Sequence, residues 1–201
     1  VASGEVDALV AERVWQEFTR GLMERCPSRM LRVLRECGAL ARVMPEIETL
    51  WEGADAIAVT QALDMVAGAG ATLDVRFAVL VRTLYPLAVE ALCGRIKVPA
   101  DCRDLGVLAA RHAHTIADAV GLEAPEILAL FNAADLWRKP DRFARLTATA
   151  VAGEADPAPV LACLKRAQAA AASVDAGMIA QTASDRAGIR SRLRCPLLPA
   201  P

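Results

Sequence analysis

The chain has 201 residues, of which 55% are hydrophobic, so it is long enough and apolar enough to bury a sizeable core. Its formal net charge is −1, which means that any basic surface must be local. It shows no signal-type N-terminus and no apolar run of about 18 residues, which argues against a membrane span and secretion and predicts a cytoplasmic protein. Its six cysteines form no Cys-x-x-Cys pair and are expected to be reduced.

The first expected elements are two amphipathic helices, at 8–24 and 27–37. Apolar residues at helical spacing form a seam along one side of both: Val14, Phe18, Leu22, Leu31 and Leu34. Pro27 suits the first turn of the second helix, because its fixed φ and missing N–H cost nothing there. Gly38 is expected to take the left-handed conformation that ends this helix.

Arginines follow the polar faces of these two helices. The candidate RNA-contacting residues are Arg13, Arg25, Arg29, Arg32 and Arg35. Arg25, Arg29 and Arg32 are spaced i, i+4 and i+7, so they can form a ridge away from the apolar seam. Residues 12–42 contain seven arginines against four glutamates. The alternative is an ordinary solvated face, because a chain with 20 arginines and 3 lysines is what a GC-rich genome produces.

Helical periodicity continues along the rest of the chain, which predicts an all-α, multi-helix fold. Further helices are expected at 55–67, 73–83, 86–96, 100–118, 124–132, 141–151, 157–172 and 174–182. Trp137 stands beside Arg138 and Lys139, a combination that could stack on and clamp a nucleic-acid backbone. A tryptophan that anchors a helix corner is the commoner explanation.

Two histidines, His112 and His114, are the only ones in the chain. Two residues apart on a helix they point about 200° away from each other, so they cannot hold one ion together as an i, i+4 pair does. His112 continues an apolar repeat and is expected to be half-buried, whereas His114 should face solvent. The histidines therefore predict no metal site.

The runs Arg-Val-Trp-Gln-Glu (13–17) and Pro-Ser-Arg-Met-Leu-Arg-Val-Leu-Arg-Glu-Cys-Gly-Ala-Leu (27–40) carry a resemblance to a known family. They resemble the neck of bacterial CCA-adding tRNA nucleotidyltransferases of the type that has a C-terminal HD domain. Further segments are similar in the same order: 73–78, 95–105, 135–143 and 194–196. The similarity covers most of the chain, with gaps near 52–60, 83–88 and 152–160.

The resemblance implies a domain order: an RNA-binding neck at 1–51, a degenerate HD-like helical domain at 52–151, and a helical body and tail at 152–201. In the family, nucleotidyl transfer uses magnesium, ATP and CTP in an N-terminal head with an Asp-x-Asp pair. These 201 residues, which begin at Val1 rather than Met, contain no Asp-x-Asp. No catalytic residue or cofactor is therefore expected, and the chain is interpreted either as a piece of a longer product or as a headless relic.

The metal-dependent phosphohydrolysis that the resemblance implies for an HD domain is expected to be lost. Arg82 and Thr83 stand where the family has its His-Asp pair, and a cationic guanidinium cannot bind a divalent metal. The upstream histidines would fall between Trp51 and Asp64, a shortened stretch that has none. Residues 84–86 replace a glycine-lysine loop, and an apolar residue at or near 151 replaces an acidic one. No metal ligand is predicted.

The C-terminal tail is basic, with arginines at 186, 190, 192 and 194. Such a tail could meet RNA non-specifically, although a disordered terminus is the default expectation. Cys195, just before a proline, is the expected exposed thiol.

The predicted function is therefore that of a tRNA-binding portion of a CCA-adding enzyme, inactive by itself. Its expected partners are tRNA and the head domain of the parent enzyme, with no membrane contact and no oligomeric state assigned. Two alternatives stay open. One is a structural or protein-interaction helical module without an RNA role, which salt-dependent tRNA binding would distinguish. The other is a residual phosphohydrolase, which would require a bound metal.

Overall fold

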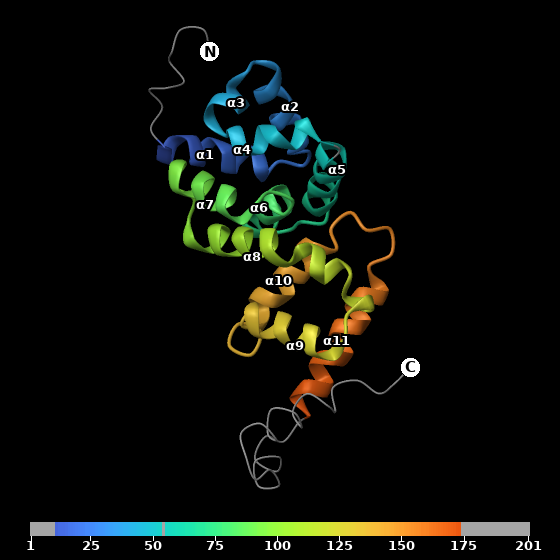
Figure 1. The fold of residues 1–201 in the computed structure, drawn as a ribbon. Coiled ribbons are helices and arrows are strands. Elements are labelled where there is room, and N and C mark those ends of the chain that lie inside the picture. The colour runs from blue at the N-terminus through green and yellow to red at the C-terminus, as the bar shows by residue number, and fades with distance from the viewer. Residues whose placement is uncertain (1–10, 54, 174–201) are drawn as a thin grey trace. The chain divides into compact units, whose positions relative to one another are not determined.

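The computed structural model describes residues 11–53 and 55–173 (Figure 1). These residues form helices and no strand, which confirms the predicted all-α fold. The longer helices are α1 (Ala11–Leu22), α2 (Ser28–Glu36), α5 (Asp55–Gly68), α6 (Leu73–Val81), α7 (Pro86–Arg95), α8 (Ala100–Ala117), α9 (Ala124–Ala133), α10 (Pro140–Ala150) and α11 (Ala158–Ala172). Their ends lie within about one helical turn of the predicted ends.

Four short elements were not predicted. They are α3 (Ala39–Val43), α4 (Pro45–Glu48) and two 3-10 turns at Thr49–Glu52 and Ala119–Gly121. Each is shorter than two turns, so the sequence has too few residues there to show a helical period. The predicted helix at 174–182, the tail arginines and Cys195 lie outside the described residues.

The described chain forms two compact units. One consists of residues 11–114 with 144–155, and the other of 115–143 with 156–173. The family-based division at 51/52 and 151/152 remains a prediction.

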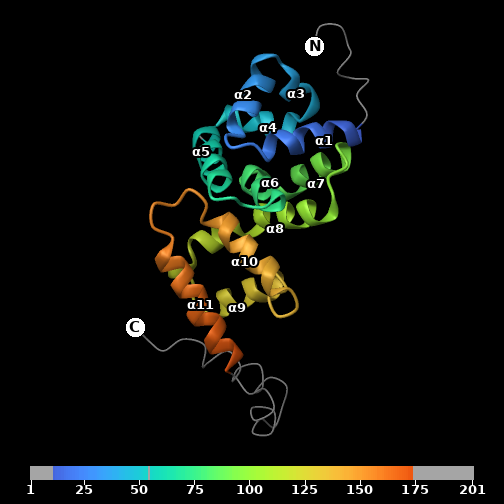
Figure 2. The same ribbon diagram turned by 180° about the vertical axis from the view of Figure 1, so that it is seen from behind.

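Helix α6 is the centre of the first unit. It lies between α1 and α8 in both views (Figures 1 and 2), and every residue from Val75 to Val81 is buried. A helix segment buried on all sides is mainly apolar, which explains the run Phe-Ala-Val-Leu-Val at 77–81, and Arg76 is the charged exception. A Cβ on Gly106 of α8 would lie 3.0 Å from the Phe77 ring and 3.2 Å from Val81, so glycine allows α8 to approach α6 closely.

The predicted apolar seam of α1 and α2 packs toward this centre. Phe18, Leu22 and Leu31 are buried, and Val14 and Leu34 are half-buried. The Trp15 ring meets the Phe77 ring edge-on, with centroids 5.5 Å apart, so α1 is anchored on α6 by an aromatic pair. The two N-terminal helices are thus held by their apolar faces and leave their polar faces to solvent.

An aromatic cluster organises the second unit. The rings of Trp137 and Phe143 each meet the Phe131 ring edge-on, at 5.9 and 5.4 Å. The Trp137 indole N–H donates to the Asn132 side chain at 3.3 Å. Trp137 therefore anchors the corner between α9 and α10, in line with the commoner explanation for this residue.

Candidate nucleic-acid interface

The arginines predicted to contact RNA lie on α1, on α2 and on the connection between them. Arg13 belongs to α1, Arg25 to the connection, and Arg29 and Arg32 to α2. All four are exposed, and none of their side chains forms a hydrogen bond or ion pair with another described residue. Since Arg29 and Arg32 are three residues apart in one helix, their side chains share a face. The structure thus leaves four cationic side chains of this region available to an external anion.

Arg35 is engaged within the protein. Its Nε donates to a carboxylate oxygen of Glu48 at 3.0 Å, and its guanidinium carbon lies 5.4 Å from the centroid of the Trp51 ring. A guanidinium over an aromatic face is attracted by the ring's electron density. Arg35 therefore holds the 3-10 turn of Trp51 against α2 and has less freedom than its four neighbours.

The start of α2 is secured from a distant helix. Asp64 of α5 accepts hydrogen bonds from the backbone N–H of Ser28 at 3.0 Å and from the Ser28 hydroxyl at 2.5 Å. A carboxylate at a helix N-terminus satisfies a free N–H and complements the helix dipole. Sequence reasoning missed this contact, because the two residues are 36 positions apart.

Helix α2 is terminated by the glycine that the sequence predicts. Gly38 has φ 74°, and its N–H donates to the carbonyl of Arg35 at 2.9 Å. The left-handed conformation suits glycine, which has no Cβ to clash. It turns the chain directly into α3, so the prediction for Gly38 is confirmed.

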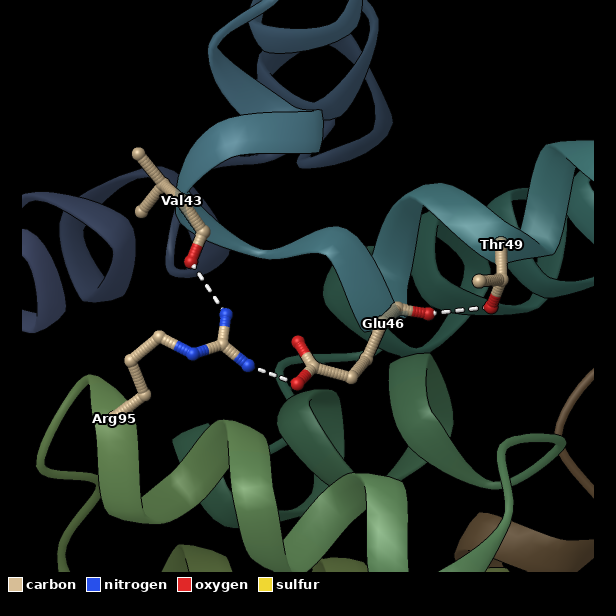
Figure 3. Close-up of polar contacts among 4 residues, drawn as sticks. All are labelled: Val43, Glu46, Thr49 and Arg95. Carbon is tan, nitrogen blue, oxygen red and sulfur yellow. Dashed lines mark hydrogen bonds and ion pairs between the residues drawn. The ribbon is translucent and has the colours of Figure 1, made fainter. Parts of the chain in front are cut away.

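Arg95 of α7 fastens the corner that follows (Figure 3). Its guanidinium donates to the carbonyl of Val43 at 3.1 Å and also pairs with the carboxylate of Glu46. The hydroxyl of Thr49 donates to the backbone carbonyl of Glu46 at 2.7 Å. One side chain thus joins the end of α3 to the start of α4 and ties both to α7.

Arg76 of α6 is the most deeply buried charged side chain of the described chain, 5% exposed. Its guanidinium donates to the carbonyls of Leu22 (2.8 Å) and Glu24 (2.9 Å) at the end of α1. It also donates to those of Ala67 (3.2 Å) and Ala71 (2.8 Å) at the end of α5. A cation at two helix C-termini is favourable, since the free carbonyls there carry partial negative charge. Sequence reasoning gave Arg76 no role of its own.

Arg82 occupies the position where the resemblance places a histidine metal ligand. Its guanidinium donates to the carbonyl of Thr149 at 2.6 Å and to that of Ala150 at 3.5 Å, at the end of α10. Burial lowers the pKa of Arg82, and the nearby Glu154 carboxylate raises it. Arg82 thus connects α6 to the end of α10 by hydrogen bonds.

The two histidines lie as predicted, His112 half-buried and His114 exposed. Burial, and to a lesser degree Arg111, lowers the pKa of His112. Within residues 11–53 and 55–173, no group of three or more His, Cys, Asp or Glu side chains is placed to hold a metal ion.

The cysteines of the described chain are free. Cys93, Cys102 and Cys163 are buried, as apolar fillers would be, whereas Cys26 and Cys37 are exposed. Burial raises the pKa of the Cys93 thiol to about 12 and that of the Cys102 thiol to about 11. Both remain neutral at physiological pH.

Residues 2–50 match the family described as the probable RNA and SrmB-binding site of polymerase A. Over 96% of its length, the chain is 43% identical to the multifunctional CCA protein of Cupriavidus taiwanensis. It is 40% identical to the proteins of the same name from Paraburkholderia phytofirmans, over 96% of the chain, and Burkholderia lata, over 90%. The chain is homologous to the multifunctional CCA proteins.

This chain spans about half the length of those multifunctional CCA proteins, 55% of the Cupriavidus taiwanensis protein, 56% of the Paraburkholderia phytofirmans protein and 52% of the Burkholderia lata protein. The first alignment extends over 230 residues although the chain has 201, so the relative carries residues inside the aligned region that this chain lacks. No solved structure matches the chain. Among the described residues, no helix is both long and apolar enough to cross a membrane.

Proposed function

We propose that this chain is the tRNA-holding portion of a CCA-adding protein and that α1 and α2 form its RNA-contacting surface. The observation that carries the proposal is the set of exposed arginines without internal partners, Arg13, Arg25, Arg29 and Arg32. They fall within the segment that matches an RNA-binding site, residues 2–50. Arginine suits this task, because its planar guanidinium binds phosphate oxygens in pairs and stays charged.

The scaffold supports the proposal by fixing the two helices. Arg76 holds the end of α1, Asp64 the start of α2, and Arg95 the corner after α3. Contacts to phosphates are more favourable when the helices that present them need no ordering on binding. The four exposed arginines, Arg13, Arg25, Arg29 and Arg32, together called the arginine face, are therefore pre-organised for a rigid, double-stranded partner such as the acceptor arm of tRNA.

The chemistry of CCA addition belongs, in this proposal, to residues outside this chain. These 201 residues contain no Asp-x-Asp pair for two-metal nucleotidyl transfer, and Arg82 stands where the HD domain would place a metal ligand. Magnesium, ATP and CTP would act in a head domain that this portion serves by holding tRNA. The contacts of Arg82 with α10 support a structural role for the HD-like region.

The test is tRNA binding by the chain that carries Arg29→Gln and Arg32→Gln together, measured over a series of salt concentrations. Each arginine neutralises about one phosphate, so the slope of log affinity against log salt should fall by up to about 2. The loss should be similar for tRNAs of different sequence, because phosphate contacts position the RNA and do not specify it. Helical content should not change, since glutamine is also a good helix former.

A matched control removes two exposed arginines from α8, Arg103→Gln and Arg111→Gln. In the structure these two pair with Asp104 and Glu90. The control changes the net charge equally but should alter the slope much less. If the chain with Arg29→Gln and Arg32→Gln binds tRNA as well as the parent chain at every salt concentration, these arginines contact only solvent. The protein-interaction alternative would then be preferred.

A further inference from the structure

A pocket of about 540 Å³ opens between α2, the 3-10 turn at Thr49–Glu52 and α5. Its volume is within the range of roughly 300–1,000 Å³ that small-molecule sites occupy. The polar and aromatic side chains that line it are Ser28, Arg32, Trp51, Thr60, Gln61 and Asp64. The pocket therefore adjoins the proposed RNA-contacting face, since Arg32 belongs to both.

Half of these polar groups are already satisfied within the protein. Ser28 donates its hydroxyl and its backbone N–H to the two carboxylate oxygens of Asp64. The Thr60 hydroxyl donates to the carbonyl of Ala56 at 2.6 Å, and it also lies 3.1 Å from that of Ile57. The groups that remain free to bind a ligand are a guanidinium, an indole and a primary amide. They belong to Arg32, Trp51 and Gln61, which form no side-chain hydrogen bond with other described residues.

Trp51 is a fixed aromatic platform. The guanidinium of Arg35 lies over its ring, and Glu48 holds that guanidinium in place. The Trp51 side chain is half-buried, so part of it stays accessible from the pocket. Nucleic-acid bases stack on accessible aromatic rings without a strong preference for one base. A ring that is already immobilised loses little entropy when a base stacks on it.

The charges in the pocket favour one orientation of a ligand. The carboxylate of Asp64, which is bonded to Ser28, repels an anion, whereas the guanidinium of Arg32 attracts one. A small free anion such as phosphate would be attracted by Arg32 and repelled by Asp64, so its net binding free energy would be small. A nucleotide can separate its parts, with the neutral base in the pocket and the phosphate at Arg32.

We infer that this pocket receives one unstacked nucleotide of a bound RNA. The base stacks on Trp51, the amide of Gln61 bonds the base edge through its donor or its acceptor, and the phosphate pairs with Arg32. The inference deepens the proposed function, on which it rests, by adding a single-stranded contact to the phosphate contacts along α1 and α2.

The first experiment is titration of the 201-residue chain with CMP, with AMP and with inorganic phosphate, followed by NMR of the indole N–H signals. The chain has three tryptophans, and Trp51→Phe and Trp137→Phe assign their signals. The Trp51 signal should shift with either nucleotide and stay in place with phosphate, while the signals of Trp15 and Trp137 stay in place throughout. An unmoved Trp51 signal at millimolar nucleotide, or an equal shift with phosphate alone, would overturn the inference.

The second experiment separates the pocket from the arginine face by variants. Trp51→Ala should weaken nucleotide binding by about fivefold or more, and Trp51→Phe should retain most of it, because a phenyl ring still stacks. Gln61→Ala, at an exposed position, should weaken it with no effect on folding. Arg29→Gln should reduce the salt dependence of tRNA binding, and Arg103→Gln on α8, outside both the pocket and the RNA-contacting arginines, should leave CMP binding unchanged.

These readouts distinguish failure of the pocket from failure of the proposed function. If tRNA binds with the expected salt slope but neither nucleotide moves the Trp51 signal, the pocket inference is wrong and the proposed function stands. If CMP binds at Trp51 but tRNA shows no salt-dependent binding, the proposed function is wrong, and so is the assignment of the pocket to an RNA nucleotide.

Discussion

Arg76 illustrates how a single buried side chain connects separate parts of the first unit. Its four hydrogen bonds go to carbonyls at the ends of α1 and α5. These bonds compensate for the burial of the guanidinium, and they satisfy carbonyls that would otherwise have no donor. An apolar side chain of similar length could fill the space but could not satisfy these carbonyls. The position of α1, and of the arginines it carries, thus depends on a residue of α6.

Replacement of Arg76 by Met should lower the free energy of unfolding by about 3 kcal/mol or more, because several buried carbonyls lose their donor. Urea unfolding followed by circular dichroism measures this change. Arg103→Met, which removes an exposed arginine bonded to its neighbour Asp104, should change the free energy by less than about 0.5 kcal/mol. Similar losses for both variants would show that the carbonyl contacts of Arg76 contribute little.

The two buried thiols should make the folded chain less stable at alkaline pH. The pKa values of Cys93 and Cys102 are raised to about 12 and about 11 in the folded chain, from the ordinary thiol value of 9.0. Above pH 9 the unfolded chain therefore releases protons that the folded chain retains. The folded state then binds more protons than the unfolded state. The free energy of unfolding is therefore unaffected by these thiols below pH 9 and falls as the pH rises beyond it.

The measurement is the free energy of unfolding of the parent chain and of the Cys93→Ala, Cys102→Ala variant between pH 8 and pH 10. The variant should be less stable at pH 8, because it loses buried volume, but its stability should decline less steeply with pH. Parallel declines would mean that these two thiols do not cause the alkaline loss.

At the level of elements, the end of α2 depends on backbone conformation. Gly38→Ala should destabilise the chain by about 1 kcal/mol, because φ 74° brings a Cβ against the backbone. Gly94→Ala provides the matched control. Gly94 lies in α7 with open space around it, so alanine there should stabilise by up to about 1 kcal/mol. In a chain of this size each kcal/mol corresponds to about 2–4 °C in Tm, which calorimetry resolves. Shifts of the same sign would count against the assigned role of Gly38.

The helices were predictable where periodicity extends over several turns, and the short elements after Gly38 were not. The seam of Phe18, Leu22 and Leu31 could be predicted because one face of a helix recurs every three or four residues. The capping of α2 by Asp64 could not, because no local pattern indicates which distant carboxylate will reach a helix terminus. The same holds for Arg95, whose partners are fixed by the packing of α7 against the α3–α4 corner.

At the scale of the whole molecule, we expect the chain by itself to catalyse neither of the two reactions that the resemblance implies, nucleotide addition and phosphohydrolysis. The 201-residue chain should add neither CMP nor AMP to tRNA and should hydrolyse no 2′,3′-cyclic phosphate with magnesium, manganese or nickel. The reason is chemical: the sequence has no Asp-x-Asp pair, and a guanidinium at position 82 repels a divalent cation. Radiolabelled nucleotide incorporation and phosphate release measure the two activities. Turnover that survives purification and disappears with a chelator would contradict the prediction.

The sequence by itself determined the helical fold, the apolar seam, the left-handed Gly38 and the resemblance that the homologues support. These properties depend on residues close together in the chain, where spacing and backbone preference act directly. Only the tertiary structure decided which arginine side chains are bound within the protein and which are not. Arg35 is held by Glu48 and Trp51, and Arg76 and Arg82 by carbonyls, whereas Arg29 and Arg32 remain free. The reason is that a charged side chain finds its partner by proximity in space, and helix packing, not local spacing, brings the two together.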